Sequence, residues 1–94
     1  MTPSSGLGFY TKDGCTLCDR ALVFVERLAR ERGLPLRLVA IDEAGGDGDL
    51  WYRHRYRIPV IELDGEELAW GRIDEAEFRT ALDAALAATK REPS

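Results

Sequence analysis

Hydrophobic and polar positions change their period several times along the chain, and each change marks an expected element. The apolar run at residues 7–10 is typical of a short buried strand, and it leads into a loop that contains Gly14. A helix is expected after this loop and is expected to end at Gly33. Residues 36–41 are then expected to form a second strand parallel to the first. Over residues 16–32, apolar side chains recur every three or four positions, as in an amphipathic helix: Cys18, Ala21, Leu22, Val25, Leu28 and Ala29.

The polar face of this first expected helix carries charges of both signs. Glu26 and Arg30 are four residues apart, the spacing at which a carboxylate and a guanidinium on one helix meet. The sequence therefore predicts an ion pair between these two side chains.

The middle of the chain is expected to contain a loop and then a short helix. Residues 43–49 are rich in Gly and Asp, which is typical of a loop. Residues 50–57 combine aromatic and basic side chains over about two helical turns. His54 lies within this short helix and is expected at the surface, or as a cation near the end of the helix.

A hairpin is expected next. Residues 58–63 and 67–70 have the apolar character of strands, and the Asp64-Gly65 pair between them is a strong signal for a tight turn. From the residues alone, Pro59 fits an ordinary trans proline at the start of an edge strand.

A last helix is expected to complete the fold. Asp74 with Glu77 resembles a capping box, so the helix is expected to begin there and to run to about Ala88. Its buried face is expected to hold apolar side chains at helical spacing: Phe78, Ala81, Leu82, Ala85 and Leu86.

The elements follow the order β-α-β-α-β-β-α, and 94 residues suit one small α/β domain. The expected organisation is a loose leader at residues 1–6, a single domain at residues 7–88 and a polar tail at residues 89–94. The leader has neither the basic start nor the apolar centre of a signal peptide, and no apolar run approaches the length of a membrane span. The cytoplasm is therefore the expected location.

Composition narrows the classes of partner. The chain is 45% hydrophobic and 32% charged, which is ordinary for a globular domain. Its formal net charge of -4 and its pI near 5.0 argue against nucleic acid or an anionic membrane as partner.

The chemistry of the chain is concentrated at Cys15 and Cys18, its only cysteines, which lie where the first helix is expected to begin. The first N–H groups of a helix lack intrahelical partners, and the helix dipole adds partial positive charge there. A thiolate at Cys15 would be stabilised by both and by Lys12, so its pKa is expected below the usual value of about 8.5. Cys18 begins the apolar stripe and is expected to be less exposed, which suits a resolving thiol in dithiol–disulfide exchange.

Three other interpretations of the cysteine pair stay open. A purely structural disulfide between the two cysteines would close a very small loop, so it would stabilise the fold by only about 2 kcal/mol. A zinc site would need further ligands, and the sequence has no second cysteine pair and a single histidine, His54. A domain that keeps both cysteines but acts only as a binding module would have the same pattern.

Taken together, these features resemble a glutaredoxin-like protein of the thioredoxin fold, in particular short glutaredoxin-like domains that carry Cys-x-Leu-Cys. The resemblance covers nearly all of the chain after Gly6, and it implies a central mixed four-stranded sheet flanked by helices. It rests on these segments: Phe9-Tyr10-Thr11-Lys12, Cys15-Thr16-Leu17-Cys18, Ile58-Pro59-Val60 and residues 71–74 after the hairpin.

The resemblance also implies roles for individual residues. Cys15 matches the nucleophile of the family and Cys18 its resolving cysteine. Pro59 matches a cis proline that faces the cysteines, and the backbone of Ile58 would pair with an extended thiol substrate as an added strand does. Lys12 matches a lysine that family members direct toward the glycine carboxylate of glutathione. The implied substrate-binding residues are Lys12, Thr16, Leu17, Ile58, Pro59 and Gly71, and no metal ligand is implied.

The chain departs from the glutaredoxin pattern at two places. Thr16 and Leu17 stand where glutaredoxins usually carry Pro and an aromatic residue. Trp70 stands at the first position of the family's Gly-Gly pair, where its bulk would close the glutathione groove or border a different groove for a protein substrate. Three arginines are candidates for replacement contacts to substrate carboxylates: Arg55, Arg57 and Arg72.

The expected function is that of a thiol–disulfide oxidoreductase. Its substrate would be a disulfide-bearing protein or a mixed disulfide with glutathione, and its reductant would be glutathione or a system of the thioredoxin reductase type. No resident cofactor is expected, with glutathione entering as co-substrate, and the expected state is a monomer. Two other classes stay open: a carrier of thiols or of an iron–sulfur cluster, and an interaction module without catalysis.

Overall fold

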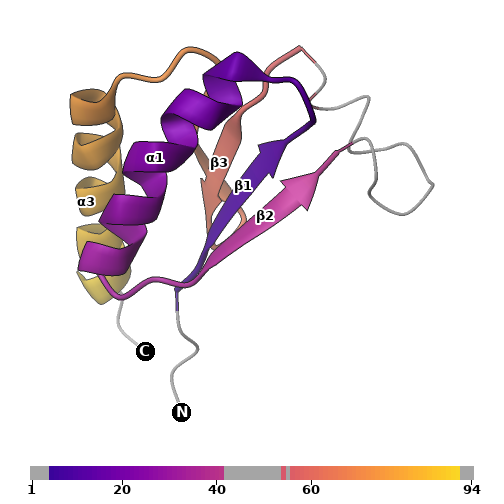
Figure 1. Ribbon diagram of the computed structural model, residues 1–94. Helices are drawn as coiled ribbons and strands as arrows, with labels where there is room; N and C mark the ends of the chain where they lie inside the picture. The colour runs from indigo at the N-terminus through magenta and orange to yellow at the C-terminus, as the bar shows by residue number, and fades with distance from the viewer. Residues whose placement is uncertain (1–4, 42–53, 55, 92–94) are drawn as a thin grey trace.

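The structure is a computed structural model that describes residues 5–41, 54 and 56–91. Its elements are β1 (Leu7–Thr11), α1 (Thr16–Glu31), β2 (Leu36–Ala40), β3 (Val60–Leu63), β4 (Glu66–Trp70) and α3 (Glu75–Arg91). The strands form one mixed sheet in the order β2-β1-β3-β4 (Figure 1). β1 pairs with β2 in parallel, as the crossover through α1 requires, and with β3 antiparallel.

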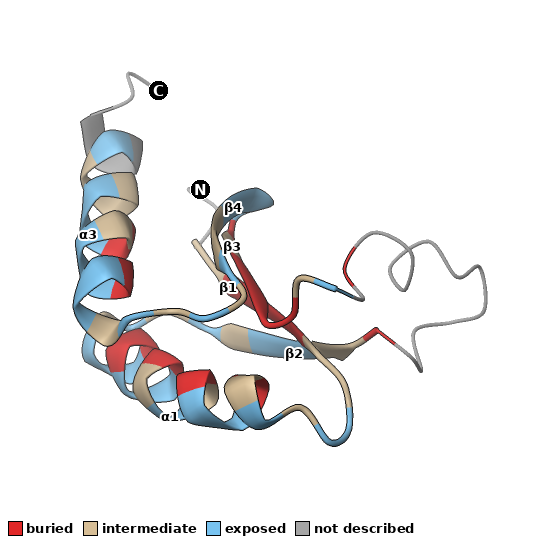
Figure 2. Cartoon of the chain, turned by 90° about the horizontal axis from the view of Figure 1, so that it is seen from above, coloured by how far each residue is buried: buried red, intermediate tan, exposed pale blue. Residues whose placement is uncertain are grey.

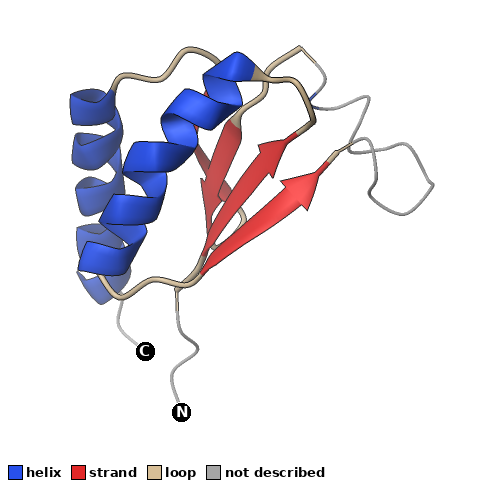
Figure 3. Cartoon of the chain, viewed as in Figure 1, coloured by secondary structure: helices blue, strands red, loops and turns tan. Residues whose placement is uncertain are grey.

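Both helices pack on the same face of the sheet (Figure 3). The core between the two layers joins apolar side chains from β1, α1, β3 and α3. In Figure 2 the buried stretches, coloured red, lie where the helices and the strands face each other. Its largest fully buried members include Phe9, Leu28, Ile61, Phe78 and Leu82. The apolar stripes expected on the two helices therefore form this core, with Ala81, Ala85 and Leu86 only partly buried.

Turn residues stand where the sequence predicted them. Gly33 ends α1 with a φ of 66°, a value that favours glycine. The hairpin turn has φ values of 52° at Asp64 and 86° at Gly65, so both residues adopt the left-handed conformation of a tight hairpin. The side chain of Asp74 accepts a hydrogen bond from the backbone N–H of Glu77 at 3.0 Å, which caps α3.

Two expectations about the helices need correction. The ion pair predicted between Glu26 and Arg30 does not form, since α1 instead has Arg27 and Glu31 at 3.9 Å, and Arg27 also pairs with Glu75 of α3. Arg27 lies on the flank of α1 that faces Glu75 of α3, whereas Glu26 and Arg30 lie on the flank beside Leu36 and Leu38 of β2. The last helix also runs to Arg91, beyond the predicted end at about Ala88.

The loop at residues 43–49 and most of the expected helix at residues 50–57 lie outside the described residues. His54 is described, and the expectation that it lies at the surface is wrong, because its side chain is only 2% exposed. Within the described ranges, no helix is both long and apolar enough to cross a membrane.

Candidate functional site

The register of the sheet brings three separate segments to one end of the molecule. Tyr10 lies opposite Val60, and Val60 lies opposite Trp70. One step further along the strands, Pro59 therefore lies between the end of β1 and Gly71. The backbone N–H of Gly71 donates to the carbonyl oxygen of Pro59 at 2.9 Å, so the hydrogen bonding of the sheet continues past the end of β3.

Cys15 occupies the N-cap position of α1 at this end of the sheet. Its backbone is extended, with φ of -90° and ψ of 102°, and its Sγ accepts a hydrogen bond from the backbone N–H of Cys18 at 3.1 Å. A cysteine sulfur thus replaces the hydroxyl or carboxylate oxygen that usually caps a helix. Negative charge on this sulfur would be stabilised by the unpaired N–H groups and by the dipole of a 16-residue helix.

The two cysteines are joined by a disulfide, with Cα atoms 5.2 Å apart. Cys18 is 1% exposed, whereas Cys15 is half-buried, so the predicted order of exposure is confirmed. An incoming thiolate can therefore reach the sulfur of Cys15, while the sulfur of Cys18 is covered by the core. This difference in access distinguishes the roles open to the two sulfurs.

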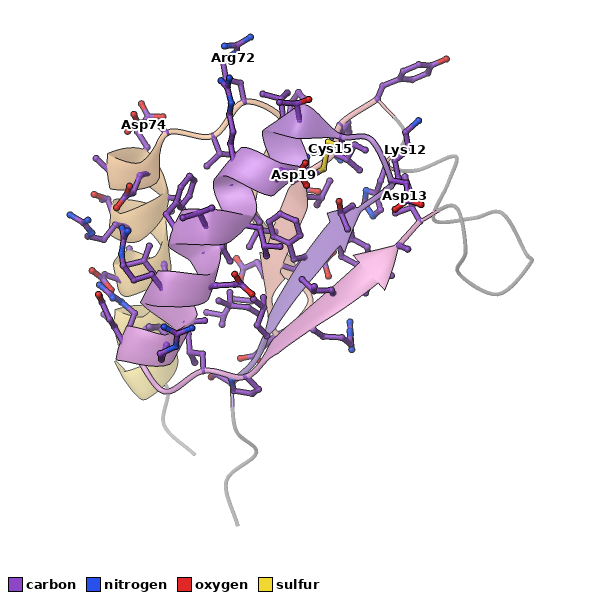
Figure 4. All side chains as sticks on the ribbon, in the orientation of Figure 1. Lys12, Asp13, Cys15, Asp19, Arg72 and Asp74 are labelled. Carbon is purple, nitrogen blue, oxygen red and sulfur yellow. A yellow bond between two sulfur atoms is a disulfide. The ribbon has the colours of Figure 1, made fainter. Side chains whose placement is uncertain are left out.

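Charged side chains surround Cys15 (Figure 4). Lys12 is half-buried at the end of β1, and Asp13 and Asp19 are exposed on either side of the cysteine in sequence. Arg72 is exposed and extends from the loop between β4 and α3, at the same end of the molecule as Cys15. Thr16 is exposed and Leu17 half-buried in the first turn of α1, so both flank the disulfide.

The segment before β3 is fixed by backbone contacts and burial. The Ile58–Pro59 peptide bond is cis, and both side chains are buried. The backbone N–H of Ile58 donates to the carbonyl oxygen of His54 at 3.1 Å, and so does that of Arg57 at 2.8 Å. The N–H of Ile58 is therefore already used within the fold, and the pairing of the Ile58 backbone with a substrate strand stays a prediction.

Behind this segment, His54 packs against Tyr10, with ring centroids 4.8 Å apart. The hydroxyl of Tyr10 donates to Oε1 of Glu62 on β3 at 3.0 Å. Burial raises the pKa of Tyr10 above its usual value, and the neighbouring Glu62 carboxylate raises it further. These contacts connect β1, β3 and the backbone that leads into Pro59, so His54 has a supporting position that the sequence did not indicate.

Trp70, at the end of β4, forms a polar and aromatic surface with Arg57. Its ring is 53% exposed, and the guanidinium of Arg57 lies 4.6 Å from the ring centroid. Arg57 also pairs with Glu67. The sequence predicts Arg57 as a candidate contact for a substrate carboxylate and Trp70 at the border of a groove. It holds no signal for their stacking, since they are thirteen positions apart and meet only through the hairpin. Arg55 lies outside the described residues.

Within the part of the chain that the structure describes, no group of three or more His, Cys, Asp or Glu residues could hold a metal ion. The reactive group that the described residues bring to this end is the Cys15–Cys18 disulfide. Exchange of that disulfide with a thiol needs only an accessible sulfur, a second sulfur within reach and groups that stabilise a thiolate.

Comparisons with known proteins agree with this geometry. A family model described as Glutaredoxin-like domain (DUF836) matches residues 6–83. The uncharacterized protein Rv0508 of Mycobacterium tuberculosis is 31% identical over 74 residues, which cover 77% of this chain and 76% of that protein. The X-ray structure of protein XcR50 from X. campestris is 38% identical, covers 84% of this chain and 97% of its own, and superposes with a TM-score of 0.64.

Thioredoxin 1 of Thermosipho africanus shares the fold alone. Its TM-score is 0.69 over 92% of this chain and 99% of its own, at 11% identity. These likenesses confirm the thioredoxin-like α/β fold, with a mixed four-stranded sheet, that the sequence predicted.

Proposed function

Because this chain belongs to the glutaredoxin-like domain (DUF836) family, we propose that it is a thiol–disulfide oxidoreductase that works through Cys15 and Cys18. The observation that carries this proposal is the position of Cys15 at the N-cap of α1, where its Sγ accepts the Cys18 N–H at 3.1 Å. A hydrogen bond to a charged acceptor is stronger than one to a neutral acceptor, so the same contact favours the thiolate over the thiol.

The proposed reaction begins with the reduced dithiol. The Cys15 thiolate attacks one sulfur of a substrate disulfide, forms a mixed disulfide and releases the other substrate sulfur as a thiolate. Cys18 then loses its proton and attacks the Cys15 sulfur, which forms the Cys15–Cys18 disulfide and releases the second substrate thiolate. The released thiolates take up protons from water, and the substrate disulfide has gained the two electrons that the dithiol has lost.

The burial of Cys18 supports this order of events. Because Cys18 is only 1% exposed, a bulky substrate cannot reach its sulfur, but α1 holds Cys18 one turn from Cys15. The intramolecular step is therefore favoured by proximity, since attack within one helix turn needs no diffusional encounter. The disulfide present in the structure corresponds to the oxidised product of the cycle.

The proposed substrates are disulfide-bearing proteins and mixed disulfides with glutathione. Lys12, half-buried beside the disulfide, is the proposed contact for a substrate carboxylate. The proposed reductant is glutathione or a system of the thioredoxin reductase type, and the proposed location is the cytoplasm, where such reductants keep thiols reduced.

The pH dependence of alkylation of Cys15 in a Cys18→Ser background tests the proposal. If the helix terminus activates this sulfur, its pKa will lie below the usual value of about 8.5, and the rate of alkylation will level off in the neutral range. A Cys15 pKa at or above about 8.5 would instead favour an interaction module without redox catalysis.

A further inference from the structure

The two outer strands of the described sheet are β2 and β4. They differ in how well they are protected from pairing with a strand of another chain. β4 carries two glutamates, Glu66 and Glu67, and its register against β3 shifts between Ile61 and Glu62, as at a β-bulge. Charges and bulges are the features by which proteins prevent an edge strand from pairing with another chain. β2 runs in regular register with β1, and its only charged side chain is Arg37.

The hydrogen bonds between β1 and β2 show which backbone groups of β2 point outward. The N–H of Leu7 donates to the carbonyl oxygen of Pro35, and the N–H of Ile41 donates to that of Thr11. Because bonding alternates along a parallel ladder, Arg37 and Val39 also bond to β1. The N–H and C=O groups of Leu36, Leu38 and Ala40 therefore point away from β1, and no other described strand pairs with them.

A shallow groove of about 380 Å³ with both apolar and charged lining lies between α1 and this edge, on the face that carries the helices. Its lining residues are Glu26, Ala29, Arg30, Leu34, Leu36 and Leu38. Leu38 is 52% exposed, and Val23, one turn before Glu26 on the same flank of α1, is 67% exposed. Two of the four large hydrophobic side chains that the described residues expose thus lie on one flank of the molecule.

Glu26 and Arg30 add a charge pattern to this flank. Both are exposed, and within the described residues neither forms the ion pair that their spacing allows. A two-fold axis perpendicular to the sheet would place a second α1 beside the first and reverse its direction. Because the two helices would then be antiparallel, Glu26 of each copy would lie opposite Arg30 of the other. Each carboxylate would therefore face a guanidinium of the second copy.

We propose that the edge of β2 and the adjoining flank of α1 form a homodimer interface, in which two β2 strands pair antiparallel about a two-fold axis at Leu38. In this register Leu38 pairs with its own copy and Leu36 with Ala40, all through backbone groups that point outward, and each such pair exchanges two hydrogen bonds. Arg37 lies opposite Val39 of the other copy, so no like charges face each other. The proposal replaces the monomer expected from the sequence.

The dimer leaves the redox site open. Cys15 lies beyond the carboxyl end of β1, whereas the proposed interface runs along the outer side of β2 (Figure 1). Antiparallel pairing directs the two disulfides toward opposite ends of one continuous sheet. The proposed interface therefore does not depend on the proposed thiol chemistry. An experiment can disprove the dimer without disproving the oxidoreductase function, and the reverse also holds.

Sedimentation of the reduced protein over a wide range of concentration tests the interface, because reductant excludes intermolecular disulfides. The wild-type chain is expected at twice the mass of one chain, and Leu38→Lys at the mass of one chain, because a buried lysine opposite its own copy opposes pairing. Ala84→Lys, which adds the same charge to the exposed face of α3, is the matched control and is expected to remain dimeric. A single cooperative thermal transition in each variant would show that both fold, since loss of the dimer by itself lowers the melting temperature.

A charge exchange supplies the second test. Glu26→Arg and Arg30→Glu are each expected to weaken dimerisation at least several-fold, because each places like charges on both sides of the interface. Mixing the two variants in equal amounts is expected to restore dimers, since all four facing charges then attract. A wild-type chain that stays monomeric, or a dimer unaffected by Leu38→Lys and by both charge reversals, would overturn the proposal.

Discussion

The backbone N–H of Cys18 donates to the Sγ of Cys15 at 3.1 Å, while the side chain of Cys18 is 1% exposed. One residue thus stabilises charge on the accessible sulfur and holds the second sulfur out of reach of a substrate. This relationship gives the two cysteines different expected phenotypes.

Cys15→Ser is expected to abolish reduction of a disulfide substrate, whereas Cys18→Ser is expected to accumulate a mixed disulfide at Cys15. Serine is a good N-cap, so Cys15→Ser should keep the fold and nearly the same melting temperature. Turnover assays and mass spectrometry of the trapped adduct measure the two effects. Residual reduction by a folded Cys15→Ser variant would contradict the assigned order of attack.

Trp70→Gly is expected to change substrate preference. The exposed ring and the Arg57 guanidinium stacked on it occupy the end of β4 beside Pro59, which is the position that the resemblance to glutaredoxins implies for glutathione. Removing the ring should raise kcat/KM for a glutathione mixed disulfide several-fold, which corresponds to about 1 kcal/mol, relative to that for a polypeptide disulfide.

Trp70→Phe is the matched control for this variant, because it keeps an aromatic ring and should leave the ratio of the two kcat/KM values nearly unchanged. An equal change for both substrates in Trp70→Gly would show that the ring supports the fold and does not select the substrate.

Local signals were sufficient to predict most of the fold and the reactive pair. The cap at Asp74, the turn at Asp64 and Gly65 and the stripe that buries Cys18 all depend on residues close in sequence. The burial of His54 depends instead on Tyr10 of β1, which lies 44 positions earlier in the sequence. No local pattern encodes such a contact.

The same reasoning explains one expectation that was wrong and one contact that the sequence did not predict. The spacing of Glu26 and Arg30 fits an ion pair, but Arg27 and Glu31 have that spacing too, and only Arg27 lies near Glu75 of α3. The stacking of Arg57 on Trp70 likewise requires the hairpin to bring the two residues together. Long-range packing selects among local possibilities that the sequence leaves equivalent.

The ion pair between Arg32 and Asp83 is expected to shape acid stability. Nε and Nη2 of Arg32 approach the two carboxylate oxygens of Asp83 at 2.7 and 3.0 Å, and this contact lowers the pKa of Asp83 below its usual value. A lowered pKa in the folded state contributes stability above the unfolded pKa of about 3.9, and this contribution is lost as the pH falls through the folded value.

Asp83→Asn should therefore lower stability near neutral pH and flatten its decline below about pH 4, when urea midpoints are measured across that range. The effect should be small, because the Asp83 side chain is 51% exposed. Asp64→Asn controls for loss of a carboxylate, because the Asp64 side chain accepts the N–H of Gly6 and forms no ion pair with another described residue. Parallel acid profiles for wild type and Asp83→Asn would show that the pair contributes nothing.

Alkaline stability is expected to depend on Tyr10. Its hydroxyl donates to Glu62, and burial with this carboxylate raises its pKa, so the folded protein holds the phenolic proton more tightly than the unfolded chain does. This contribution is complete below the unfolded pKa of about 10 and is lost as the pH rises through the folded value, because the unfolded chain releases the proton first.

Tyr10→Phe should cost about 0.5–1.5 kcal/mol near neutral pH, since it removes the hydrogen bond, and it should lose less stability than wild type above about pH 10. Tyr56→Phe is the matched control, because that ring is 83% exposed and its removal should leave the alkaline decline unchanged. If urea midpoints of Tyr10→Phe fell as steeply as those of wild type above about pH 10, the Tyr10–Glu62 contact would not be the source of the alkaline loss.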